Sequence, residues 1–405
     1  MTGRSETGAG GPADVLVYVQ HLLGIGHLRR AAIIAKALDR AGLEVVLASG
    51  GSPVAGLDLG GARLVQLPPV RARDETFAVL VDRDDRPIDA AWKAARAERL
   101  CALYRALRPK VLVVELFPFG RRQMRFELLP LLEAAWASRP RPQILCSLRD
   151  VLTGQRNPEK TAWMLDTFAR YFDLALVHGD PDFLPLERSF PRATEIAEKL
   201  RYTGYVVAGM PAPDPLERAG EGEVLVSTGG GAVAAPLVEA ALGARALGPL
   251  DATTWRLLVG PNTPETEFQD LAARAPAGFV VERARPDFRA LLARARLSIS
   301  QAGYNTVLEV LAAGIPAVVA PFAAGSETEQ SLRAGLLAER GALTVVDEAA
   351  LGPETLAAAV RAALARDAAT REVAARGPRL AGLDTSGADK TAEIVRQRLA
   401  IVAPR

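Results

Sequence analysis

The sequence predicts an α/β protein of two domains, each built around a parallel sheet. Short runs of Val, Leu and Ile recur along the chain, separated by segments whose apolar residues have helical spacing. Continuous apolar runs between helices are typical of parallel strands, because both faces of such a sheet are covered. The pattern stops in a segment rich in Pro, Gly and charge at 206–222, which we interpret as a linker, and restarts beyond it.

The first domain is expected to span 14–205. Its first apolar run is followed by the loop QHLLGIGH and by LRRAAIIAKALDRAG, a helical pattern that ends at a glycine. Residues 1–13 are polar and glycine-rich and lack the apolar core of a signal peptide, so they are interpreted as a disordered tail. The strands expected in this domain are 14–19, 43–49, 110–115, 143–147 and 173–178.

The second domain is expected to span 223–380, followed by a C-terminal helix within 381–405 that could pack on either domain. Ligands of open parallel sheets bind at the carboxyl ends of the strands, so the residues that follow each apolar run are the candidates for function. The strands expected here are 224–228, 254–260, 279–283, 297–300 and 317–321.

Composition excludes several classes of protein. Lys plus Arg (49) nearly balances Asp plus Glu (47), which argues against a nucleic-acid-binding protein. No run of about 18 apolar residues is present, so no transmembrane helix is predicted. Cys101 and Cys146 are too far apart to suggest a disulfide framework or a zinc site. We expect a cytoplasmic protein without a metal site or cofactor, and a peripheral membrane contact stays open.

The chain has three histidines, His21, His27 and His178, and each falls at or just after the carboxyl end of an expected strand. His27 lies between the Gly24-Ile25-Gly26 turn and a helix start. Its near-neutral pKa suits a general base that deprotonates a hydroxyl or a water. His21 could instead be a positioning residue and His178 could line a cleft, although a lone histidine more often has a structural role.

The glycine turn resembles the start of a dinucleotide-binding fingerprint, but the rest of that motif is missing. Arg29 occupies the third glycine position, and the next strand ends in Ser and Gly without a carboxylate for a ribose, so a dehydrogenase is not favoured. The turn could still hold an anion at the helix N-terminus, with Arg29 and Arg30 adding charge. Alternatively, the two arginines form a solvated helix face. The residues assigned to the acceptor side are His21, Gly24, Gly26, Arg29, Arg30 and His178.

Glu115 closes a strand and could orient a catalytic histidine, or it could be an ordinary surface or salt-bridged residue. The following RRQMRF, with Phe117 and Phe119 nearby, fits either a basic-aromatic patch for an anionic acceptor or lipid surface, or a solvated helix start. Asp180 and Asp182 in HGDPDF are interpreted as turn residues rather than a metal pair.

Two loops of the second domain suit a nucleotide. Ser227 to Gly231 lie between a strand and a helix and offer backbone N–H groups, which suits a diphosphate, although the GK[ST] of a P-loop is absent. The loop 301–305 opens another helix, in which Thr306-x-x-Glu309 fits a capping box; alternatively, Glu309 grips the hydroxyls of a ribose. The predicted donor-binding residues are Thr228, Gly229, Gly230, Gly231, Gln301, Gly303, Asn305, Thr306, Glu309, Glu329 and Gln330, the last two as partners of a sugar hydroxyl.

Gly303, Thr306, Glu309, the run AAGIPAVVAPF and Gln330, with the earlier glycine loop, resemble the C-terminal donor domain of MurG-type glycosyltransferases. Those enzymes transfer N-acetylglucosamine to lipid I in peptidoglycan synthesis. The resemblance implies the GT-B fold, in which two Rossmann-like domains face each other across a cleft. It also implies that UDP binds here, with its ribose on Glu309, its phosphates on Gly229–Gly231 and Gly303, and the sugar on Gln330.

In the first domain GIGHLRR replaces the more glycine-rich acceptor loop of that family. It resembles the GxGHxxR loop of the UDP-sugar hydrolase of pseudaminic acid synthesis, a MurG-like protein in which the matching histidine is the catalytic base. The whole chain, including YVQHLLGIGHLRR and ELFPFGRRQMRFELLP, is most similar to a bacterial group of predicted glycosyltransferases.

Together these features predict a metal-independent, inverting glycosyltransferase. It would take a nucleotide sugar, with a UDP sugar favoured, as substrate and transfer the sugar to a hydroxyl of a small-molecule or lipid-linked acceptor. His27 would be the base, oriented by Glu115, and domain closure would expel water. A UDP-sugar hydrolase, a UDP-sugar epimerase and a non-catalytic sugar-nucleotide binder remain as alternatives.

Overall fold

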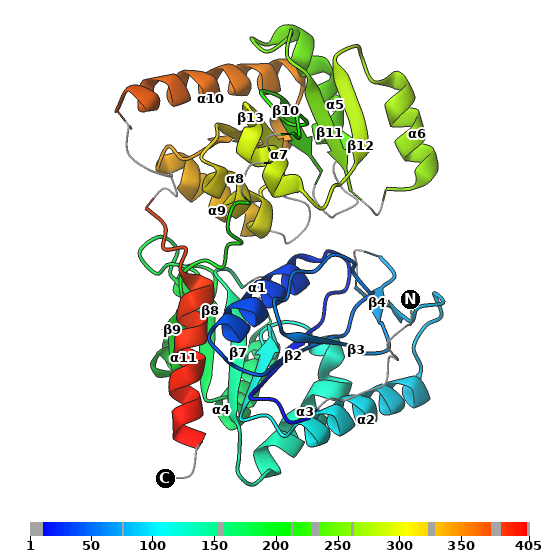
Figure 1. Ribbon diagram of the computed structural model, residues 1–405, viewed down its shortest axis with the longest axis vertical. Coiled ribbons are helices and arrows are strands. Elements are labelled where there is room, and N and C mark those ends of the chain that lie inside the picture. Colours follow the sequence, from blue (N-terminus) through cyan, green and yellow to red (C-terminus); the bar gives the residue numbers. More distant parts are fainter. Residues whose placement is uncertain are drawn as a thin grey trace. The chain divides into compact units, whose positions relative to one another are not determined.

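The computed structural model describes residues 11–74, 77–152, 157–211, 214, 216–228, 235–260, 263–322, 329–373 and 382–402. The chain divides into two compact units (Figure 1). Unit 1 comprises Met1–Val206 and Thr385–Arg405, and unit 2 comprises Val207–Asp384. The predicted phosphate-binding residues Gly229, Gly230 and Gly231 lie outside the described residues.

Unit 1 contains a seven-stranded sheet in the order β3-β2-β1-β6-β7-β8-β9, in which every neighbouring pair is parallel. The strand order reverses next to β1, because the chain first adds β2 and β3 on one side and then β6 to β9 on the other. The strands are β1 (Val15–Val19), β2 (Val45–Ser49), β3 (Arg63–Gln66), β6 (Val111–Glu115), β7 (Gln143–Arg149), β8 (Leu174–His178) and β9 (Leu200–Tyr202).

Helices cover both faces of this sheet. Helices α1 and α11 pack against each other and share one apolar core with the alternate residues of β1, whereas α2, α3 and α4 build the core on the opposite face. The C-terminal helix therefore belongs to unit 1. The helices are α1 (Gly26–Arg40), α2 (Ala90–Leu107), α3 (Arg125–Ala137), α4 (Pro158–Tyr171) and α11 (Gly387–Val402), with 3₁₀ helices η1 (Arg122–Met124), η2 (Leu186–Arg188) and η3 (Pro191–Lys199).

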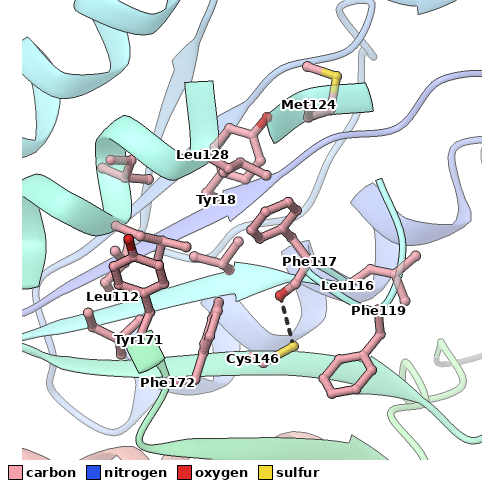
Figure 2. Close-up of a cluster of buried hydrophobic side chains, with 14 of the residues drawn as sticks. Tyr18, Leu112, Leu116, Phe117, Phe119, Met124, Leu128, Cys146, Tyr171 and Phe172 are labelled. Atoms are coloured by element: carbon pink, nitrogen blue, oxygen red, sulfur yellow. Dashed lines mark hydrogen bonds between the residues drawn. The ribbon is translucent and has the colours of Figure 1, made fainter. Parts of the chain in front are cut away.

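The loop between β6 and η1 is anchored by aromatic side chains (Figure 2). Phe117 and Phe119 are buried in the core, where Phe119 packs on Phe168 and Phe190 with ring centroids 5.3 and 5.7 Å apart. The Phe117 carbonyl accepts a hydrogen bond from Cys146 Sγ at 3.1 Å. The two phenylalanines therefore do not form the exposed basic-aromatic patch that the sequence allowed; burying their apolar rings stabilises the loop instead.

Unit 2 contains a second parallel sheet, with the order β12-β11-β10-β13-β14-β15. Its order reverses next to β10, as that of unit 1 does next to β1. The strands are β10 (Val224–Ser227), β11 (Trp255–Val259), β12 (Phe279–Arg283), β13 (Leu297–Ser300), β14 (Ala317–Val319) and β15 (Thr344–Val345). The helices are α5 (Ala235–Ala244), α6 (Glu265–Arg274), α7 (Phe288–Arg294), α8 (Tyr304–Ala313), α9 (Glu329–Glu339) and α10 (Pro353–Val373), with 3₁₀ helices η4 (Arg245–Leu247) and η5 (Glu348–Ala350).

The predicted fold class of two parallel-sheet α/β domains is confirmed. The sequence did not reveal β3, β9 and β15, or the antiparallel ribbon of β4 (Arg71–Ala72) and β5 (Leu80–Val81). These strands have only two to four residues and are partly exposed, so they lack a continuous apolar run. Among the described residues no helix combines the length and hydropathy needed to span a membrane.

Candidate active site

The switch in strand order of unit 1 places the carboxyl ends of β1 and β6 side by side. β1 leads through Gln20 and His21 into the loop that precedes α1, and β6 ends at Glu115. Chain connections leave this point in opposite directions, which opens the edge of a parallel sheet to ligands. The sequence had assigned catalytic roles to His27 and Glu115, and both lie at this switch point.

His27 lies in the first turn of α1 and contacts Glu115. Its Nδ1 is 2.8 Å from Glu115 Oε1, and the side chains of His27 and Glu115 are 12% and 2% exposed. An ionised carboxylate only accepts hydrogen bonds, so Nδ1 carries the proton and Nε2 keeps its lone pair. The expected contact between the histidine and the strand-ending carboxylate is therefore present.

Arg30 is the third member of this group. It lies one turn beyond His27 on the same face of α1, and its Nη2 donates to Glu115 Oε1, the oxygen that His27 also contacts. Arg30 is buried, and its Nη2 is 3.4 Å from His27 Nδ1. The interpretation that the two arginines form a solvated helix face is therefore wrong for Arg30. Arg29 is exposed, as that interpretation expected.

Burial and charge set the protonation states of this group. Burial lowers the pKa of His27 to about 3, which outweighs the opposite effect of Glu115 and is reinforced by the charges of Arg121 and Arg149. Burial alone would raise the pKa of Glu115, but the neighbouring His27 and Arg30 hold it below its usual range. At neutral pH a neutral imidazole therefore faces an ionised carboxylate, an arrangement that can accept a proton at Nε2.

His21 is buried and does not reach the surface of unit 1. Its ring lies against Gly51, where a Cβ would stand 2.4 Å from His21 Cε1. Burial lowers the pKa of His21 to about 4. Its assignment to the acceptor side is corrected to a buried residue that packs against Gly51.

His178 is also a structural residue. Its side chain is 0% exposed, its Nε2 is 2.9 Å from Ser147 Oγ, and its Nδ1 is 2.9 Å from Thr203 Oγ1. Burial lowers its pKa to about 3. The expectation that His178 lines a cleft is wrong, because the segment after β9 covers it: Thr203 N–H and Gly204 N–H donate to the carbonyls of Val177 and Gly179.

The remaining predictions for the first domain concern loops. Gly24 is exposed, with no atom near the position of an added Cβ, and Gly26 is the first residue of α1. Asp180 Oδ1 accepts from the Asp182 N–H at 2.9 Å, so this pair forms a turn as predicted. Sequence reasoning did not single out Arg121, which it had included only within RRQMRF, as a basic-aromatic patch or a solvated helix start; its position six residues after a strand-ending carboxylate was the available signal.

The switch point of unit 2 lies between β10 and β13. Thr228, which follows β10, is buried; its Oγ1 accepts from the Gly260 N–H at 2.9 Å and donates to the Leu258 carbonyl at 3.4 Å. These contacts tie the end of β10 to β11. The assignment of Thr228 to the donor is therefore corrected to a residue that holds the loop in place.

Helix α8 starts at the carboxyl end of β13, as the sequence predicted, but its first turn differs. Its N-cap is Gly303, which has extended backbone angles and no side-chain cap, and Tyr304 is its first residue. Thr306 therefore lies inside the helix, and the predicted capping box is wrong. The roles predicted for the loop and for the first two turns of the helix stay predictions. The residues concerned have partly exposed side chains, and they are Gln301, Asn305, Thr306 and Glu309.

Two other predicted donor residues, Glu329 and Gln330, open helix α9. Glu329 is buried and its Oε1 accepts from Arg333 Nη2 at 2.7 Å, while Arg333 Nη1 donates to the Ala302 carbonyl at 3.4 Å. Glu329 therefore supports the loop before α8, and its role as a sugar ligand is corrected. Gln330 Oε1 accepts from the Phe322 N–H at 3.1 Å, which orients its amide.

Comparisons with known proteins show what this chain resembles. Residues 224–381 match the glycosyltransferase family 28 C-terminal domain. The chain is 37% identical over 171 residues to a Ralstonia nicotianae protein, the UDP-N-acetylglucosamine--N-acetylmuramyl-(pentapeptide) pyrophosphoryl-undecaprenol N-acetylglucosamine transferase. The match covers 39% of this chain and 46% of that protein, so the chain spans about half the length of this curated relative.

Solved structures extend the likeness to both units. MurG of Acinetobacter baumannii superposes with a TM-score of 0.56 at 18% identity, covering 95% of this chain and 99% of that one. This chain has the GT-B fold. The glycotransferase of kitacinnamycin also superposes on it, with a TM-score of 0.62 at 18% identity and coverage of 96% and 100%.

The described residues contain no group of three or more His, Cys, Asp or Glu side chains arranged to hold a metal ion. The charged groups at the switch point of unit 1 are one carboxylate and arginine side chains. Any negative charge that develops in a ligand there would face guanidinium groups rather than a set of carboxylate ligands.

Proposed function

We propose that this chain is a glycosyltransferase that moves a sugar from a nucleotide-sugar donor, with UDP as its nucleotide, to an acceptor hydroxyl. The observation that carries the proposal is the His27–Glu115 contact at the sheet switch point of unit 1, in a chain whose residues 224–381 match a glycosyltransferase family 28 C-terminal domain. The donor would bind to unit 2, which carries the domain match, and the name of the Ralstonia relative supports a UDP sugar as that donor.

In this proposal His27 Nε2 takes the proton of the acceptor hydroxyl while the hydroxyl oxygen bonds to the anomeric carbon of the sugar. The bond from that carbon to the diphosphate oxygen breaks, and its electron pair leaves with UDP. Attack from the face opposite the leaving group inverts the anomeric centre. Glu115, paired with Arg30, keeps the Nδ1 proton in place and stabilises the imidazolium that forms.

Unit 2 would bind the nucleotide. Asn305, Thr306 and Glu309 lie on the first two turns of α8, and the positive end of this helix attracts the diphosphate. In the proposal Glu309 holds the ribose hydroxyls and Gln330 contacts the sugar. Negative charge that develops on the leaving diphosphate is then stabilised by backbone N–H groups, without a metal ion.

The test is the release of nucleoside diphosphate from a panel of UDP, dTDP and GDP sugars, with and without a fractionated cell extract, followed by chromatography. Release that requires an extract fraction and is lost in His27→Ala supports the transferase. The matched control is Arg99→Ala, an exposed arginine on α2, which should keep full activity. Equal release without extract would identify a hydrolase, and a changed sugar without release would identify an epimerase.

The stereochemistry needs its own measurement. Once a donor is known, proton NMR of the first product formed gives the configuration of the new glycosidic bond. Inversion relative to the donor agrees with a single displacement assisted by His27. Retention would contradict the role of His27 as the base that activates the acceptor.

A further inference from the structure

Arg121 is a charged side chain at the switch point of unit 1 that the proposed transfer step does not use. It lies six residues after Glu115, and its Nε donates to the carbonyl of Gln20 at 2.9 Å. Gln20 directly follows β1, so this bond ties the end of the β6 loop to the end of β1. The guanidinium group is therefore held between the two strand ends that flank the site.

The loop that carries Arg121 is rigid. Phe117 and Phe119 bury its middle in the core (Figure 2), the Leu116 N–H donates to the Ser147 carbonyl at 2.8 Å, and the Gly120 N–H donates to the Leu116 carbonyl at 2.9 Å. Arg121 itself has a positive φ of 55°, which a non-glycine residue adopts at a cost of about 1 kcal/mol or more. The position of the guanidinium is thus set before any ligand arrives.

Charges in this region are not balanced. The Glu115 Oε1 atom is shared by His27 and Arg30, and no carboxylate among the described residues forms an ion pair with Arg121. Burial lowers the pKa of Arg121 to about 10, partly offset by Glu115 and reinforced by the charges of Arg149 and Arg30. Its charge also lowers the pKa of both His21 and His27.

We propose that Arg121 binds an oxyanion of the acceptor, a carboxylate or a phosphate, next to the hydroxyl that His27 deprotonates. This inference rests on the proposed function and names the class of its acceptor. A guanidinium presents parallel N–H donors that match either oxyanion. With Nε bound to Gln20, the two Nη groups remain to contact the ligand. The N-cap of α1, Ile25, offers no side-chain hydrogen bond and the first turn of α1 has no acidic residue, so the helix end also favours an anion there.

The test measures anion binding without turnover. The chain has only three histidines, so selective ¹³C labelling gives three Cε1–H signals, which single substitutions assign. Methyl phosphate and acetate are titrated separately, and the two arms distinguish a phosphate from a carboxylate. We expect a saturable shift of the His27 signal with one of them, while the signal of the buried His178 stays in place and reports that unit 1 is folded.

Variants then decide where the anion binds. Arg121→Gln should weaken binding at least tenfold, and Arg121→Lys, which keeps the charge but loses the paired N–H donors, should bind more tightly than Arg121→Gln and more weakly than wild type. The matched control is Arg125→Gln, an exposed arginine four residues further on, which should bind like wild type. Absence of a saturable His27 shift with both anions, or equal binding by Arg121→Gln, would overturn the proposal.

Failure of this inference is distinguishable from failure of the proposed function. If Arg121 only supports Glu115, wild type shows no anion-dependent shift, whereas nucleotide release still depends on His27. If the chain does not transfer sugars, no nucleotide is released, but the anion titration still measures whether Arg121 binds an anion. The two measurements therefore test separate statements.

Discussion

Unit 1 and unit 2 have the same kind of sheet, with a reversal of strand order next to the first strand, but different groups stand at the two switch points. In unit 1 they are charged side chains, with His27 and Arg30 sharing one oxygen of Glu115. In unit 2 they are a loop and a helix N-terminus. The buried ion pair of Glu329 with Arg333 supports that loop through the hydrogen bond from Arg333 to the Ala302 carbonyl. This contrast suggests that unit 1 moves a proton and unit 2 binds a nucleotide.

Replacing the base should have the largest effect. His27→Ala removes the proposed base, so turnover should fall ~10²–10⁴-fold. Donor affinity, measured by calorimetry with UDP, should stay within a few-fold, because unit 2 is unchanged. Added imidazole should restore part of the rate. A parallel loss of UDP binding and turnover would instead show that the proposed division between the units is wrong.

The two buried carboxylates provide the next comparison. Glu115→Gln and Glu329→Gln each remove the negative charge that faces a buried arginine, which should destabilise the corresponding unit by about 3 kcal/mol. Hydrogen–deuterium exchange resolved by peptide should show the loss of protection in unit 1 for the first variant and in unit 2 for the second. Unchanged protection in either unit would mean that its ion pair contributes little to stability.

Of these two variants, only Glu115→Gln should change the hydrogen bonding of His27. Glu115→Gln weakens the acceptor of the His27 Nδ1 proton, so kcat should fall even at temperatures where the variant is folded. Glu329→Gln has no such link and should act on donor binding alone. Its own control is Glu267→Gln, because Glu267 is an exposed carboxylate on α6 whose loss should alter neither unit.

A smaller effect is expected from Glu309, on the second turn of α8. If its carboxylate holds the ribose, Glu309→Gln should raise the KM for the donor about tenfold or more, the usual cost of losing hydrogen bonds to a charged group. The effect should vanish when donors without ribose hydroxyls are compared. A fall in kcat at unchanged KM would place Glu309 outside the nucleotide site.

Much of the fold was predictable because the central strands are short segments rich in Val, Leu and Ile between helical patterns. The contact between His27 and Glu115 was also predictable, since the carboxyl ends of parallel strands meet at one edge of a sheet. The role of Arg30 could not be assigned in advance. Its position one turn after His27 was visible, but the choice between a solvated face and an ion pair depends on which face of α1 the sheet buries.

The residues that were misassigned are those whose role depends on whether another part of the chain buries them. His178 ends β8 at the expected edge, yet the segment after β9 closes over it, and β9 was too short to be predicted. Glu329 and Arg333 have the i,i+4 spacing of a helical ion pair, but burial decides that this pair supports the loop. The capping box failed because Gly303 caps α8 three residues earlier than Thr306 would have.

The pH dependence of stability measures how much the burial of a histidine destabilises the fold, independently of any role of that histidine in turnover. The folded-state pKa of His27 and of His178 is about 3, below the ordinary value of 6.5, so the unfolded chain binds more protons between these values. The free energy of unfolding should therefore fall as pH drops below 6.5, by up to about 1.4 kcal/mol per pH unit for each histidine. Between pH 6.5 and 5 most carboxylates do not yet contribute.

His178→Gln and His27→Gln should each reduce this slope by the contribution of one histidine. Urea unfolding followed by tryptophan fluorescence is suitable, because Trp92, Trp136 and Trp163 lie in unit 1 and only Trp255 lies in unit 2. The two variants should differ in turnover, which His27→Gln abolishes and His178→Gln keeps within about tenfold of wild type. An unchanged slope for His27→Gln would show that this imidazole is solvated, and its near-neutral pKa would then give activity an acid limb near pH 6.5.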